Sequence, residues 1–159
     1  MEHSNSDTIR IFHEGVAVGT ISPQEMAELA GGTFDISERV PNAEGKAFDF
    51  HSWYKAWRHQ NGLDEDISVP NQLTVEAADT FEAVIPWSQL ENAAVLYASP
   101  DGGALTKSGP IRLYAPNGTS DCLNVKSIVL MRFMHDGSHN REAHYGFKNV
   151  FTPDELRKK

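Results

Sequence analysis

Two apolar segments near the end of the chain most restrict the fold that it can adopt. Ile111 to Ala115 and Val125 to Phe133 have the length of β-strands, and the second contains an unbroken apolar run from Ile128 to Met131. Such a run is typical of a strand covered on both faces, because a strand with one face in water alternates apolar and polar residues. We therefore expect Val125 to Phe133 to lie inside a sheet.

Two β-hairpins are expected earlier in the chain. Thr8 to Ile21 holds two short apolar segments on either side of Glu14-Gly15, where glycine supplies the positive φ of a tight turn. Gln72 to Ala77 and Phe81 to Ile85 form the second pair of strands, joined by three residues. Further strands are expected at Thr33 to Val40 and Ala94 to Ala98.

Two helices are expected between these strands. Ser22-Pro23-Gln24-Glu25 has the pattern of a capping box with proline at the first helical position, and Gly31-Gly32 ends the helix that follows. A second helix, from about Asp49 to Gln60, places Phe50, Trp53, Tyr54 and Trp57 on one face. Aromatic rings at helical spacing usually face a sheet, so we interpret this stripe as core packing rather than a cofactor site.

The chain is organised as one domain, because 159 residues are too few for two ordinary cores. The order of the expected elements indicates an α+β domain of mostly antiparallel strands with inserted helices. We assign residues 8–133 to this domain, residues 1–7 to a disordered N-terminus and residues 134–159 to a polar, irregular tail. Thr152-Pro153-Asp154-Glu155 repeats the capping pattern and predicts a short helix at the end of that tail.

Charge and cysteine usage restrict the partners. The formal net charge of -8 argues against nucleic acid and anionic membranes, since neither gains counterion release from a carboxylate. Cys122 is the only cysteine, which excludes an internal disulfide. Neither a basic leader nor a run of the ~20 apolar residues that a membrane helix needs is present, so the expected location is the cytoplasm.

The end of the expected domain resembles a known family. The sequence Gly-Pro-Ile-Arg-Leu-Tyr-Ala-Pro from Gly109 to Pro116, a polar loop, and then Asn124-Val125-Lys126-Ser127-Ile128 are similar to the closing strands of the molybdopterin-binding domain of sulfite-oxidase-like oxidoreductases. Leu73 to Ile85 resembles the hairpin of that family, Pro86 to Asn92 its short helix and Ala94 to Ser99 its next strand. The resemblance covers roughly Ser22 to Phe133 and implies the molybdopterin-binding fold.

The resemblance also implies where a metal would be held. In the family, molybdenum is bound by the pterin dithiolene and by one cysteine, which lies in a segment corresponding to residues 35–42 here. That segment contains no cysteine, and neither a hydroxyl nor a carboxylate replaces a thiolate as the soft donor. We therefore expect a binding or partner-recognition module without catalytic residues, metal or cofactor. The alternative is an active molybdopterin-dependent oxidoreductase in which Cys122 or a partner protein completes the coordination.

Anion binding is expected near the same closing strands. Lys126 matches the lysine of the Val-Lys motif, and in the family basic residues around this loop meet the terminal phosphate of the pterin. Asn124, Ser120 and the backbone N–H groups of residues 118–120 are candidates to join Lys126 around a phosphate-bearing small ligand. The competing interpretations are a solvated surface lysine at Lys126 and a free, partly buried thiol at Cys122, with a protein rather than a small molecule as the partner.

A third hypothesis uses the histidines of the tail. His135, His139 and His144 lie close together in the sequence, and three imidazoles can bind zinc or a similar ion in a metal-binding or scaffold protein. Their spacing matches no closed zinc-site pattern, which favours solvated loop histidines. No hydrolase elbow, phosphate loop or dinucleotide fingerprint occurs in the chain.

Overall fold

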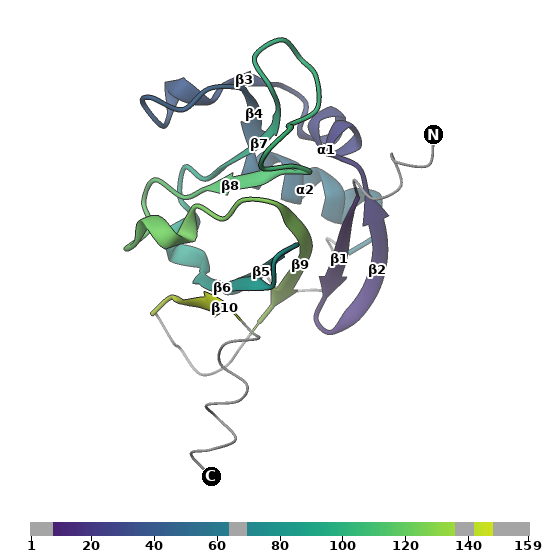
Figure 1. The fold of residues 1–159 in the computed structure, drawn as a ribbon. Helices are drawn as coiled ribbons and strands as arrows, with labels where there is room; N and C mark the ends of the chain where they lie inside the picture. The colour runs from purple at the N-terminus through teal and green to yellow at the C-terminus, as the bar shows by residue number, and fades with distance from the viewer. Residues whose placement is uncertain (1–7, 64–69, 136–141, 148–159) are drawn as a thin grey trace.

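The computed structural model describes residues 8–63, 70–135 and 142–147, which form two sheets and two α-helices in an α+β arrangement (Figure 1). The larger sheet has the strand order β10-β6-β5-β9-β1-β2, and the smaller has the order β3-β4-β7-β8. All strand pairs of the described part are antiparallel except β1 with β9. The predicted α+β class with mostly antiparallel strands is therefore confirmed.

The strand bounds are β1 (Ile9–His13), β2 (Val16–Ile21), β3 (Phe34–Asp35), β4 (Lys46–Asp49), β5 (Gln72–Ala77), β6 (Phe81–Pro86), β7 (Ala94–Ala98), β8 (Arg112–Tyr114), β9 (Ile128–Met134) and β10 (His144–Phe147). The helices are α1 (Pro23–Ala30) and α2 (Phe50–Gln60), and three single turns of 3-10 helix are η2 (Ile36–Glu38), η3 (Trp87–Leu90) and η4 (Asp121–Leu123).

Local sequence signals place both hairpins and both helices as expected. Glu14 and Gly15 have φ of 52° and 83°, which are the positive values that a tight turn between β1 and β2 requires. The Ser22 hydroxyl accepts a hydrogen bond from the Glu25 N–H at 3.2 Å, and a Glu25 carboxylate oxygen accepts one from the Ser22 N–H at 2.9 Å. This reciprocal capping box begins α1, and Gly31 ends it with φ of 84°.

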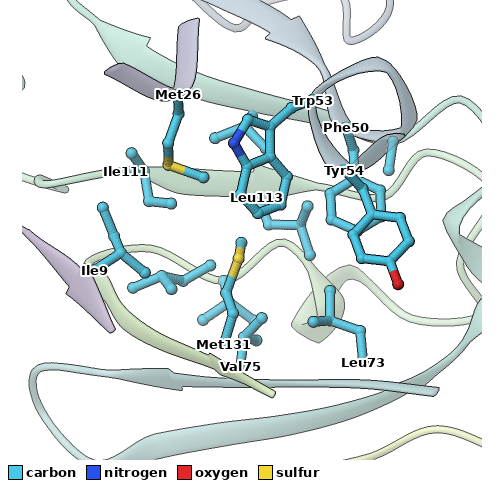
Figure 2. Close-up of a cluster of buried hydrophobic side chains, with 14 of the residues drawn as sticks. Ile9, Met26, Phe50, Trp53, Tyr54, Leu73, Val75, Ile111, Leu113 and Met131 are labelled. Atoms are coloured by element: carbon cyan, nitrogen blue, oxygen red, sulfur yellow. The ribbon is translucent and has the colours of Figure 1, made fainter. Parts of the chain in front are cut away.

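The main core lies between α2 and the two sheets. Figure 2 shows side chains from α2, from β8 and from the larger sheet pointing into one cluster. Phe50, Trp53, Tyr54 and Trp57 of α2 are all buried, and the ring of Tyr54 lies 4.5 Å from that of Phe133 on β9, measured between centroids. The aromatic stripe is therefore core packing, as predicted.

β9 is an interior strand, bonded to β5 on one side and to β1 on the other. Leu130 and Met131 are both buried although neighbouring residues of a strand point to opposite faces, so both faces are covered at this point. β9 begins at Ile128 rather than Val125. The preceding residues instead connect β8 to the larger sheet, because Leu113 donates to the Val125 carbonyl at 2.8 Å and Ile128 donates to the Ile111 carbonyl at 3.0 Å.

Two expectations are wrong. Thr33 to Val40 is not one strand, because β3 has only two residues and the chain then turns into η2, where the Ile36 N–H donates to the Gly45 carbonyl at 2.9 Å. The tail is not irregular throughout, because His144–Phe147 forms β10 and pairs with β6. The predicted disordered N-terminus and terminal helix lie outside the described residues.

Candidate functional site

The candidate site is a cavity of about 250 Å³ where the β5–β6 turn, β8, η4 and β10 meet, named here the Lys126 cavity. Three of the four predicted site residues line it: Cys122, Asn124 and Lys126. They come together because η4 and the residues after it cross the end of the β5–β6 hairpin before β9 begins. Ser120, the fourth predicted residue, is not among the residues that line the cavity.

Arg112 is a second cation of the cavity. It lies on β8 with its guanidinium carbon 4.8 Å from the centre of the Tyr114 ring, and its Nε atom is buried without a hydrogen-bond partner in the described part of the chain. A buried donor without a partner costs free energy, and the side chain that carries this one lines the cavity. Together with the exposed Lys126, Arg112 makes the cavity suitable for a phosphate or carboxylate group.

Asp79 is the acidic residue of the cavity. One of its carboxylate oxygens accepts a hydrogen bond from the Phe81 N–H at 3.2 Å in the β5–β6 turn. The charged side chains that line the cavity are thus Arg112, Lys126 and Asp79, beside the Cys122 thiol. The formal charge of the lining is therefore positive, although the net charge of the whole chain is -8. An anionic ligand therefore meets a favourable local potential here.

The loop before β9 supplies fewer free donors than expected. The Gly118 N–H donates to the Ala115 carbonyl at 2.9 Å, and both the N–H and the hydroxyl of Thr119 donate to Gln89 Oε1 at 3.0 Å. Ser120 caps η4, because its hydroxyl accepts the Cys122 N–H at 3.0 Å. The expectation that the N–H groups of residues 118–120 face an anion is wrong for Gly118 and Thr119, because one donates within the loop and the other donates to Gln89 of η3.

Asn124 and Cys122 have different surroundings. Asn124 Oδ1 accepts the Ala115 N–H at 2.9 Å, which fixes the carboxamide beside β8 and directs its NH₂ group away from that bond. Cys122 is exposed, so the expected partly buried thiol is wrong. Its position on η4 gives the thiol access both to solvent and to the cavity.

Residues 35–42, which the motif resemblance compares with the metal-binding segment of the sulfite-oxidase-like family, lack suitable donors. Residues 35–42 form the end of β3 and the turn η2, where Asp35, Ser37 and Glu38 are exposed. Arg39 of this segment is engaged, since its Nη1 atom lies 2.7 Å from Asp49 Oδ1 and donates to the Ala93 carbonyl at 3.0 Å. Oxygen donors do not replace the thiolate that molybdenum requires, so this segment does not fit the metal.

His13 and Tyr54 form a buried polar pair that was not expected from the sequence. His13 is 3% exposed, and its Nε2 atom shares a hydrogen bond of 2.7 Å with the Tyr54 hydroxyl. Burial lowers the pKa of His13 and raises that of Tyr54. The signal was present, because the alternation of β1 places His13 on the same face as the buried Ile9 and Ile11.

The tail histidines are only partly described. His135 is exposed, His144 begins β10, and His139 lies outside the described residues. Across residues 8–63, 70–135 and 142–147, no three His, Cys, Asp or Glu side chains are placed to hold one metal ion. The three-histidine site therefore stays a prediction.

No known family model matches the chain, and no curated protein matches it. The likeness to sulfite-oxidase-like proteins therefore rests on the motif residues alone. None of the helices in the described ranges has the length and apolar character needed to cross a membrane.

Proposed function

We propose that this chain is a small binding domain on a sulfite-oxidase-like molybdopterin-binding scaffold, and that the Lys126 cavity takes the phosphate of a small ligand. The observation that carries the proposal is the joint presence of Lys126 and Arg112 in one cavity, each from a segment of the family-like motif. Two cations that line one cavity can bind a dianionic phosphate through charge-assisted hydrogen bonds, which are stronger than those between neutral groups.

The phosphate end and the metal end of a molybdopterin meet different surroundings in this chain. Arg112, Lys126 and the Asn124 amide are donors that suit a phosphate. The corresponding metal-binding segment, residues 35–42, offers hydroxyl and carboxylate oxygens instead of a thiolate. This mismatch supports ligand binding without oxygen-atom transfer.

Phosphate titration followed by amide NMR tests the proposal. Inorganic phosphate, added at constant ionic strength, should shift the amide signals of residues 122–126 and of Arg112. Replacing one cation, as in Lys126→Gln or Arg112→Gln, should weaken this binding about tenfold or more, because each removes a charge-assisted hydrogen bond. Lys107→Gln is the matched control, since Lys107 is exposed and does not line the cavity. Shifts outside the cavity, or equal affinity in all three variants, would reject the proposal.

The alternative function is a molybdenum enzyme, and the observation that favours it is that the exposed Cys122 lines the same cavity. Expression in a host that makes the cofactor, followed by metal analysis and pterin fluorescence, separates the two. The binding-domain proposal predicts pterin, if any, without stoichiometric molybdenum. Stoichiometric molybdenum that is lost in Cys122→Ala but retained in Ser120→Ala would establish the enzyme instead.

A further inference from the structure

The opposite end of the larger sheet carries a different cavity. β2 forms the outer edge of this sheet beside α1 and α2 (Figure 1). A cavity of about 400 Å³, named here the β2 cleft, lies between β2 and the two helices. Its accessible apolar surface comes mainly from the half-buried Val18 and Leu29, while Ile11, Ile21 and Trp57 lie buried behind it. This surface suits an aliphatic chain.

The charged side chains of the β2 cleft are both acidic. Glu25 and Glu28 of α1 are exposed and line it, whereas no lysine or arginine is among its lining residues. Gln60 and Asn61, also in the lining, belong to the C-terminal end of α2, where the helix dipole is negative. The cleft therefore favours a positively charged group, in contrast to the cationic Lys126 cavity.

The backbone of β2 also leaves hydrogen-bonding groups available. β2 pairs with β1 only, so within the described part of the chain its outer edge has no neighbouring strand. The register shifts between Ile11, paired with Gly19, and Phe12, paired with Ala17, so that Val18 has no partner on β1 and lines the cleft. An edge strand of this kind can accept an extended segment through main-chain hydrogen bonds.

We propose that the β2 cleft docks an extended peptide segment of a partner protein that carries a lysine or arginine. The peptide backbone pairs with β2, the aliphatic part of the basic side chain covers the apolar floor, and its charged end meets Glu25 and Glu28. Charge complementarity with an acidic cleft selects the basic side chain, and the open strand edge selects a peptide over a free amine.

NMR titration with a defined peptide tests this docking. Acetyl-Thr-Val-Lys-Val-Thr-amide should shift the backbone amides of residues 16–21 and of Glu28. The same peptide with glutamate in place of lysine should not bind. In an extended peptide, the N–H groups of alternate residues point to opposite edges. N-methylation of both valines therefore blocks one edge, and N-methylation of the lysine and both threonines blocks the other. One of these two peptides should lose binding. Spermidine, a free amine, should bind at least about tenfold more weakly than the lysine peptide, because it forms no strand pairing.

Charge-reversal variants provide the matched control. Glu28→Lys should lower the affinity for the lysine peptide about tenfold or more. Glu91→Lys makes the same change in net charge at an exposed residue that does not line the β2 cleft, so it should leave this affinity unchanged. Glu25 is left unchanged in this experiment, because its carboxylate is part of the capping box that begins α1 and its replacement would also destabilise that helix. Equal weakening in both variants, equal binding of the glutamate peptide, or spermidine binding as tight as the peptide would each overturn the proposal.

Discussion

His13 is a buried ionisable side chain whose surroundings favour its neutral form. Its ring lies among those of Tyr54, Trp57 and Phe133, with centroid distances of 5.8 to 6.0 Å. Its Nδ1 atom is buried and has no hydrogen-bond partner in the described part of the chain. Burial lowers the pKa of His13 below 6.5, while the nearby Glu14 carboxylate raises it and the Arg58 guanidinium lowers it further.

The first prediction concerns stability against pH. Because the folded protein holds His13 at a lowered pKa, the unfolded chain binds the proton more tightly, and stability falls as the pH drops from about 6.5 through the folded pKa. The free energy of unfolding should therefore be level above that range and fall below it, by up to about 1.4 kcal/mol per pH unit.

Urea unfolding between pH 5 and 8 measures this dependence. His13→Gln should remove most of the slope below pH 6.5, whatever its effect on absolute stability, because glutamine does not titrate. His135→Gln is the control, since His135 is exposed. An unchanged slope in His13→Gln would show that other groups govern the pH dependence.

At the scale of elements, the junction before β4 depends on a residue without a side chain. Gly45 has φ of 128°, and a Cβ atom there would lie 2.6 Å from both the Ala98 carbonyl oxygen and Leu96 Cδ1 on β7. Gly45→Ala should therefore destabilise the protein by roughly 2–4 kcal/mol, through backbone strain and overpacking. Gly32→Ala should be nearly neutral, because Gly32 has no positive φ and no atom within 4 Å of its Cβ position. Thermal unfolding of both variants checks this difference, and equal losses would contradict it.

The elements that the sequence predicts correctly are those with local causes. The capping box at Ser22, the turn at Glu14-Gly15 and the aromatic stripe of α2 each lie within a few residues, so a single sequence contains the whole signal. η2 and β10 depend on distant partners instead. Ile36 turns inward because the Gly45 carbonyl accepts its N–H, and β10 forms because it pairs with β6.

The same distinction applies to the Lys126 cavity. Lys126, Asn124 and Cys122 are close in sequence and could be predicted together. Arg112 was visible as a charged residue in an apolar strand, but the burial of its Nε atom depends on packing. Asp79 and Phe147 join the cavity only because the β5–β6 turn and β10 meet there, which no local pattern indicates.

At the scale of the whole molecule, the smaller sheet links two hydrophobic clusters. Neighbouring residues of its strands point to opposite faces. Phe48 and Val95 therefore belong to the main cluster, whereas Ala47 and Leu96 belong to a second cluster around Ile36. Because β4 and β7 contribute to both clusters, neither cluster can open without disturbing the strands that support the other. We expect the described part of the molecule to unfold as one cooperative unit.

Ile36→Ala tests this coupling, since Ile36 is fully buried in the second cluster and all three tryptophans pack in or against the main one. The variant should lose about 2–5 kcal/mol, the usual range for truncating a buried isoleucine. Its tryptophan fluorescence and far-ultraviolet circular dichroism should shift together in urea, although the change lies in the other cluster. Val16→Ala, at a side chain 65% exposed, should change stability by less than about 0.5 kcal/mol. Separate transitions for the two signals would mean that the clusters open independently, and that the smaller sheet transmits no stability between them.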